Sequence, residues 1–119
     1  MGEWARLRAG TTVRGGLERG FWYAVHLRQA DGIIWLKGPE ESTVSLEAKL
    51  IRVIDREPEV VTRLPETEFQ PIRPGEPAAK LRYYGICPKG HFIKGVPEGN
   101  APVPCGKCAR AYRVEDEDP

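Results

Sequence analysis

All three cysteines of the 119-residue chain lie between positions 87 and 108, together with one of its two histidines. Cys87 and His91 form a C-x₃-H pair, and Cys105 and Cys108 form a C-x₂-C pair. Cys₃His is one of the usual ligand sets of a structural Zn²⁺ ion in tetrahedral coordination. The spacing therefore predicts one structural zinc ion bound by these four residues.

Both pairs contain residues that favour tight turns. Pro88 and Gly90 lie within the first pair, and Gly106 lies within the second. Glycine tolerates the positive φ angles that allow a short turn to direct two side chains at one ion. We therefore expect Gly90 and Gly106 to shape the two turns.

Three alternative roles fit part of this pattern. A disulfide would leave one of the three cysteines unpaired and gives His91 no role. A redox C-x-x-C motif usually belongs to a βαβ unit, but no helical pattern follows Cys108. Residues 104–108 match the P-C-x-x-C half of the zinc deaminase signature, yet no glutamate follows His91 and a fourth protein ligand closes the site. A structural metal is the favoured interpretation.

The segment from Lys80 to about Val114 resembles a zinc ribbon, a family in which two metal-binding knuckles are joined by a short β-sheet. The resemblance rests on C-P-K-G-H at 87–91 and C-G-K-C at 105–108. Ribbon knuckles commonly read C-P-x-C-G, so the first knuckle departs from the family by using His91, one residue later. The sequence around the ligands fits three strands, at 81–86, 91–96 and 110–114. Metal binding can supply on the order of 10 kcal/mol of folding free energy to so short a segment.

Residues 1–56 have the pattern of short β-strands. Extended segments are expected at 3–8, 21–28 and 33–37, with a hairpin turn at Asp31-Gly32 before the last of them. Residues 43–54 fit either strands or a helix, and their β-branched residues favour two strands, at 43–47 and 50–55.

Five short antiparallel strands in about sixty residues are most easily accommodated in a small barrel, which removes exposed sheet edges. The strand order is similar to an SH3-like barrel of the Tudor or KOW kind, and an OB-like barrel is the alternative. The fold class expected for the chain is all-β, with an N-terminal small antiparallel SH3-like barrel at 1–56 and a C-terminal three-stranded zinc ribbon at 80–114.

Two further segments are expected to lie outside these domains. Residues 57–79 contain five prolines, which argues against a central strand or a long helix and predicts a semi-rigid linker. Residues 115–119 are four consecutive acids and a proline, which predicts a disordered tail.

Composition limits the classes of protein that the chain can belong to. Hydrophobic residues make up 40% and charged residues 29%, as in ordinary globular domains. The longest apolar run, 21–25, is far shorter than the roughly 20 residues that span a bilayer, and the amino terminus lacks a secretory h-region. We therefore expect no membrane partner and, with thiols suited to a metal, a reducing cytoplasm. Arginine outnumbers lysine and Asn, Gln and Met are scarce, a bias compatible with a thermophile.

The predicted ribbon is strongly basic and contains a single acid, Glu98. Its basic residues are Lys80, Arg82, Lys89, Lys94, Lys107, Arg110 and Arg113, and four aromatic residues are interleaved with them, Tyr83, Tyr84, Phe92 and Tyr112. Such a surface can neutralise phosphates and stack bases. It predicts binding to RNA, DNA or a nucleoprotein complex. The alternative is a purely structural face, in which the aromatics form the core and the lysines offset thiolate charge.

A protein-interaction adaptor is the second functional hypothesis. In it, Trp22, Trp35 and the proline-rich segment form the contact surface and the metal is purely structural. No Ser/His/Asp constellation or carboxylate pair stands out, so an enzyme is not expected, and His26 is expected to be an ordinary surface histidine.

Overall fold

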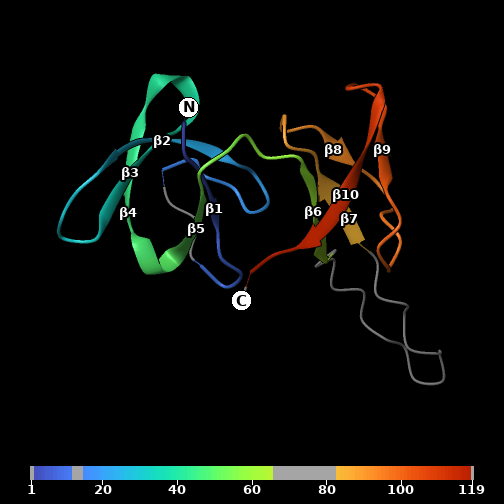
Figure 1. Cartoon of the computed structure of the whole chain (residues 1–119), viewed down its shortest axis with the longest axis horizontal. Helices are drawn as coiled ribbons and strands as arrows, with labels where there is room; N and C mark the ends of the chain where they lie inside the picture. Colours follow the sequence, from blue (N-terminus) through green and yellow to red (C-terminus); the bar gives the residue numbers. More distant parts are fainter. Residues whose placement is uncertain (1, 12–14, 66–82, 119) are drawn as a thin grey trace.

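The computed structural model describes residues 2–11, 15–65 and 83–118 (Figure 1). In these residues the chain forms two five-stranded sheets that lie side by side, and the only helical elements are two 3₁₀ turns. The expected all-β fold class is confirmed. No helix in the described part of the chain is long and apolar enough to cross a membrane.

The first sheet is nearly closed and barrel-like, and it contains the strands of the N-terminal half. They are β1 (Trp4–Leu7), β2 (Tyr23–Arg28), β3 (Ile33–Lys37), β4 (Thr43–Glu47) and β5 (Ile51–Ile54), in the order β4-β3-β2-β1-β5 with antiparallel pairing throughout. A 3₁₀ turn, η1 (Pro39–Glu41), precedes β4, and a second, η2 (Ala48–Leu50), joins β4 to β5. The prediction of two strands in 43–54 is therefore confirmed, with one short turn between them.

Strand β1 is buried on both of its faces. Ala5 and Leu7 belong to a core cluster with Leu36 and Ile51, whereas Arg6 lies between them in sequence and is also fully buried. Successive side chains of a strand point to opposite sides of the sheet. Arg6 therefore points away from the first core and toward the second sheet.

The second sheet includes a strand from the segment predicted to be a linker. Its strands are β6 (Val60–Pro65), β7 (Tyr83–Ile86), β8 (Phe92–Ile93), β9 (Val103–Cys105) and β10 (Arg110–Asp116), in the order β8-β7-β6-β10-β9. Strand β6 is central, antiparallel to β7 and parallel to β10. The prediction that 57–79 contains no central strand is wrong for residues 60–65, and the three strands expected at 80–114 belong to a larger sheet.

The physical reason is the position of the prolines. Pro58 precedes β6 and Pro65 is its last residue, so every residue from Val60 to Leu64 keeps the N–H that a central strand must donate on both sides. Counting prolines over the whole segment concealed this proline-free stretch. The rest of the predicted linker, 66–79, lies outside the described residues.

The acidic tail is also ordered by pairing. Glu115 and Asp116 extend β10, so the prediction of disorder from 115 onward is wrong for the described residues up to 118. The four acids each meet arginine: Glu115 and Asp118 contact both Arg6 and Arg52, Asp116 pairs with Arg63 at 2.7 Å, and Glu117 pairs with Arg19. Opposite charges from distant segments offset the repulsion among consecutive carboxylates.

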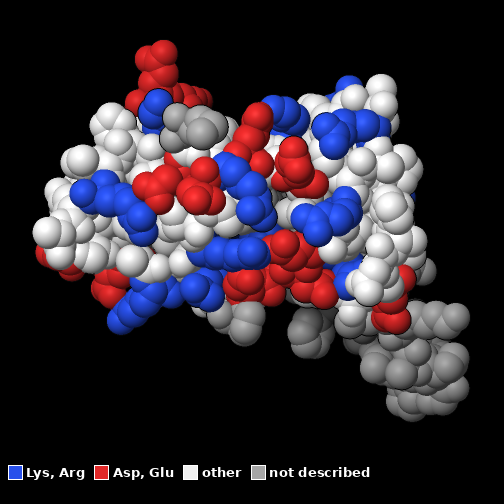
Figure 2. Space-filling view, in the orientation of Figure 1, with Lys and Arg blue, Asp and Glu red and all other residues white. Residues whose placement is uncertain are grey.

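Arg6 joins the two sheets. Its guanidinium lies 4.6 Å from the centre of the Trp22 ring and donates hydrogen bonds to Thr62 Oγ1 at 2.7 Å, Glu115 Oε1 at 2.7 Å and Asp118 Oδ2 at 3.1 Å. Figure 2 shows acidic and basic side chains alternating along the junction between the halves. A buried guanidinium bound to carboxylates of the other sheet fixes how the two sheets sit together.

Gly20 lies at the same junction and allows close approach. Its φ is +86°, and a Cβ placed on it would lie 2.5 Å from Leu64 Cδ1 and 3.1 Å from Ile86 Cγ1. Both of those residues belong to the second sheet. At Gly20 the loop before β2 therefore approaches that sheet closely through its backbone.

Gly20→Ala is expected to destabilise the protein more than Gly32→Ala. Both glycines have φ of +86°, but nothing lies within 4 Å of a Cβ at Gly32. Each variant carries the backbone cost of about 1–2 kcal/mol, and only Gly20→Ala adds overpacking of about 1–3 kcal/mol. Urea unfolding of both variants measures the difference, and equal losses would mean that the sheets are not packed as described.

Arg6→Ala is expected to cost about 2–5 kcal/mol of unfolding free energy, because it removes a large, fully buried side chain and leaves Thr62 without its hydrogen-bond partner. Arg28→Ala is the matched control, since Arg28 pairs with Glu3 on an exposed surface at 2.8 Å, where such pairs contribute about 0–1 kcal/mol. Urea unfolding of both variants is the measurement. A loss of unfolding free energy in Arg6→Ala no larger than that in Arg28→Ala would contradict the role of Arg6 in joining the two sheets.

Candidate metal centre

The metal-ligand candidates lie on the face of the second sheet that points away from the first. Thr62 and Leu64 of β6 face Arg6 and Gly20, so the intervening side chains face the other way. Val61, on that far face, is fully buried in a cluster with Cys87 and Cys105. The three candidate cysteines thus form much of the core on this side of the sheet.

Cys87, His91, Cys105 and Cys108 converge, with their ligand atoms all within 4.8 Å of one another. Cys87 Sγ lies 3.8 Å from Cys108 Sγ, and His91 Nδ1 lies 3.6 Å from Cys105 Sγ and 3.3 Å from Cys108 Sγ. A tetrahedral ion with bonds of about 2.3 Å to sulfur and about 2.0–2.1 Å to nitrogen requires separations of about 3.5–3.8 Å. The four residues therefore fit one metal ion, with Nδ1 as the histidine ligand.

The first knuckle, residues 87–91, connects β7 to β8. The Gly90 N–H donates to the Cys87 carbonyl at 2.8 Å, the Cys87 N–H donates to the His91 carbonyl at 2.9 Å, and the His91 N–H points at Cys87 Sγ at 3.3 Å. Gly90 has φ of +87°, so its predicted role in the turn is confirmed.

The second knuckle, residues 105–108, connects β9 to β10. The Ala109 N–H donates to the Cys105 carbonyl at 3.0 Å, and Ala109 itself has φ of +56°. Gly106 does not adopt a positive φ, so the expectation that it supplies the left-handed residue is wrong. Alanine tolerates this conformation only at some cost in strain, which the turn imposes to bring Cys108 beside Cys105.

The local electrostatics favour a thiolate at the second knuckle. Burial raises the pKa of Cys105, but hydrogen bonds from the Cys108 and Lys107 backbone and from His91 outweigh it and lower that pKa to about 6. Burial raises the pKa of Cys87. A hydrogen bond to Cys108, together with burial, raises the pKa of Tyr112 to about 12. Because the thiolate is the metal-binding form of cysteine, the lowered pKa of Cys105 favours its role as a ligand.

The arrangement gives less support to a disulfide or to a metal site with an open position. All three cysteines are free, so the disulfide alternative is not formed. Among the described residues, this is the one group of three or more His, Cys, Asp or Glu side chains that could hold a metal ion. Since each of the four residues offers one ligand atom, a tetrahedral ion would have its positions filled by protein.

The predicted basic residues are only partly brought together. Lys80 and Arg82 lie outside the described residues. The remaining five are exposed, but Lys89 pairs with Glu57 at 2.7 Å and the Arg110 guanidinium lies 4.6 Å from the Tyr112 ring centre. Lys94 and Lys107 lie at the two knuckle hairpins. Arg113 lies apart from them, because it is paired with Val60 and borders the junction of the two sheets.

One aromatic residue beside the ligands is exposed. Phe92 directly follows His91 and is 63% exposed. Its ring stacks on that of Tyr84, with ring centres 5.3 Å apart and an angle of 27° between the ring planes. The sequence placed Phe92 among the basic residues, but its exposure could not be read from its position. Tyr112, by contrast, is buried in the metal-side core.

Sequence reasoning missed two contributors to the site. Val61 packs against the ligand cysteines, and Glu57 pairs with the knuckle residue Lys89. Both come from the predicted linker. The apolar Val60-Val61 pair next to Thr62 was the available signal. No protein-family model, curated protein or solved structure matches the chain.

His91→Ala is expected to weaken metal binding by more than the roughly 10–100-fold that outer-shell residues contribute, whereas His26→Ala leaves it unchanged because His26 is exposed on β2. Titration with Co²⁺, read by the absorption of a tetrahedral thiolate site, measures both variants against the parent. One ion per chain is expected, and loss of binding in the His26 variant would contradict the assignment.

Proposed function

We propose that the Cys₃His cluster holds one structural Zn²⁺ ion and that the C-terminal half is a zinc ribbon extended by β6. Three thiolates and one imidazole form a donor set that suits Zn²⁺, and three of the separations between their ligand atoms match its bond lengths. The metal would cross-link two hairpins whose small core includes three of the ligands, the cysteines. Its contribution to folding is therefore large.

The N-terminal half is proposed to be an SH3-like barrel. The support is a nearly closed sheet of five short antiparallel strands around one core cluster. The closing strand β5 pairs with β1, which brings the end of this half back to its beginning. The barrel provides a rigid support against which the ribbon is held through Arg6.

The function that this arrangement supports best is non-enzymatic binding of single-stranded nucleic acid, free or within a nucleoprotein assembly. The observation that carries the proposal is the exposed Phe92, stacked on Tyr84 beside the metal ligands and two residues from Lys94. An exposed aromatic face offers a base a stacking platform, and nearby lysines neutralise phosphates.

The charge around the knuckles is consistent with this role. Residues 87–110 carry four basic side chains and one acid, Glu98. Figure 2 shows basic side chains gathered over the hairpin that joins β9 and β10. The metal fixes this hairpin and the neighbouring one in place, so the basic groups are presented on a rigid surface. Because the ligand cysteines must stay reduced, we place the protein in the cytoplasm.

The adaptor hypothesis loses one of its contact residues. Trp22 is 8% exposed and its ring is covered by Arg6, so it does not present a face to a partner. The nucleic-acid proposal is favoured because the exposed aromatic residue lies at the basic end of the molecule instead. Salt dependence separates the two, since a protein complex formed through apolar contacts does not release phosphate counterions.

Phe92→Ala is expected to weaken binding to a labelled single-stranded RNA or DNA by about 1–3 kcal/mol, the usual contribution of one base–aromatic stack. Lys94→Gln and Lys107→Gln are each expected to lower the slope of log K against log salt by about 0.7. Fluorescence anisotropy between low and high salt gives both quantities.

Lys37→Gln is the matched control, because Lys37 is exposed at the end of β3 in the other sheet. It is expected to change neither the affinity nor the slope. Binding that is insensitive to salt, or equally weakened by Lys37→Gln and Lys94→Gln, would overturn the proposed surface.

A further inference from the structure

The first knuckle, residues 87–91, packs against an aromatic residue of the N-terminal half. A Cβ placed on Gly90 would lie 3.3 Å from Cε1 and 3.5 Å from Cδ1 of Phe21. The Phe21 ring therefore occupies the space into which any side chain at position 90 would project. The turn between Cys87 and His91 thus rests on the segment that precedes β2.

Gly90 is connected to both ligands of this knuckle. Its φ is +87°, its N–H donates to the Cys87 carbonyl at 2.8 Å, and it directly precedes His91. A displacement of Gly90 would therefore move both ligands. A site whose ligands are held in the binding geometry before the ion arrives loses less conformational freedom on binding, and its affinity is higher for that reason.

The residues on either side of Phe21 fix its position. A Cβ placed on Gly20 would lie 3.1 Å from Cγ1 of Ile86, the residue that precedes Cys87. Tyr23, on the other side, packs against the core of the first sheet, and its ring centre lies 6.4 Å from that of Phe21. Phe21 thus connects the first core to the knuckle.

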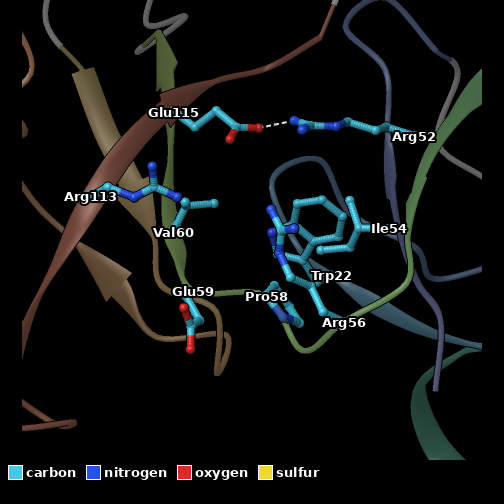
Figure 3. A pocket seen from close by; sticks show the side chains of 9 residues that line it. All are labelled: Trp22, Arg52, Ile54, Arg56, Pro58, Glu59, Val60, Arg113 and Glu115. Carbon is cyan, nitrogen blue, oxygen red and sulfur yellow. Dashed lines mark hydrogen bonds and ion pairs between the residues drawn. The ribbon is translucent and has the colours of Figure 1, made fainter. Parts of the chain in front are cut away.

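Trp22 anchors the same segment at the junction of the two sheets. It is 8% exposed, and the Arg6 guanidinium lies over its ring. A small pocket beside it, the Trp22 pocket, is lined by residues of both halves, among them Ile54, Val60 and Arg113. Figure 3 shows the Trp22 ring beside Ile54, with Val60 of β6 across the pocket. These contacts involve no knuckle residue, so they order the segment independently of a metal ion.

A second contact between the knuckle and the preceding segments is electrostatic. Lys89 Nζ lies 2.7 Å from Oε1 of Glu57, which lies between β5 and β6. The two side chains are 58% and 64% exposed. Exposed pairs contribute little, because water competes for both charges and two long side chains lose freedom. The packing of Gly90 on Phe21 is therefore the stronger of the two contacts.

We infer that Phe21 is a positioning residue of the metal site, which holds the first knuckle in the turn that presents Cys87 and His91. The inference rests on the proposed metal ion, and it adds that the affinity for the ion depends on the N-terminal half, which contributes none of the four ligands. By linkage, the bound ion strengthens the contact between the two halves by the same factor by which that contact strengthens ion binding.

The test is a Co²⁺ titration of the full chain, read by the absorption of the tetrahedral thiolate site. Phe21→Ala is expected to bind one ion with an unchanged spectrum and about tenfold lower affinity, an effect typical of residues outside the ligand shell. Phe21→Leu keeps apolar bulk beside Gly90 and is expected to lose less. Leu27→Ala is the matched control, because it truncates a large apolar side chain of the same half that is 51% exposed, and the affinity is expected to stay unchanged.

A double-mutant cycle separates this role from a general loss of stability. Among the described residues other than its chain neighbours, only the Phe21 ring lies within 4 Å of a Cβ at Gly90. Gly90→Ala is therefore expected to weaken Co²⁺ binding less on the Phe21→Ala background than in the parent. Gly95→Ala is the control for backbone strain, since Gly95 has φ of +70° and nothing lies within 4 Å of its Cβ. Its effect is expected to be the same on both backgrounds.

The outcomes distinguish this inference from the proposed metal site. Unchanged Co²⁺ affinity in Phe21→Ala, an equal loss in Leu27→Ala, or an effect of Gly90→Ala that is the same on both backgrounds would overturn the role of Phe21 and leave the metal site in place. A parent chain that binds no Co²⁺ would overturn both. If Phe21→Ala does not fold, Phe21→Leu decides: a measurable loss of affinity supports the inference, and an unchanged affinity refutes it.

Discussion

The interaction on which the rest of the structure depends is the burial of Arg6 between the two sheets. A guanidinium with no exposed surface must exchange its hydration for protein partners, because an unpaired buried charge is very costly. It obtains them from Thr62, Glu115 and Asp118 of the other half, and from the face of Trp22. Those contacts exist only if both sheets are folded and correctly placed.

The same bridge orients the two faces of the second sheet. Thr62 and Glu115 turn toward Arg6, so Val61 and the knuckle cysteines face the opposite side and form a second core there. In a sheet this small, apolar residues alone give little burial. The four converging side chains lie close enough to hold one metal ion, which would supply the missing cohesion. Strand β6 gives both knuckle hairpins a shared central strand.

Charged side chains have different roles at the junction of the two sheets and at the knuckles. At the junction, arginines and carboxylates neutralise each other, and the acidic end of β10 is ordered for that reason. At the knuckles, Lys94, Lys107 and Phe92 are all exposed. The first distribution stabilises the assembly of the sheets, whereas the second leaves cations available to a partner, which agrees with the proposed binding of nucleic acid.

The sequence alone determined the local features. Ligand identity and spacing defined the Cys₃His cluster, and alternation with β-branched residues placed β3 and β4 at their observed bounds, because these depend on neighbours along the chain. Only the tertiary structure decided that residues 60–65 form a central strand, that the acidic tail joins β10, and that Arg113 borders the Trp22 pocket rather than the knuckles. Proline counts and charge runs record local preference, but strand pairing and charge neutralisation bring together residues as far apart as Arg6 and Glu115, and no local pattern contains that information.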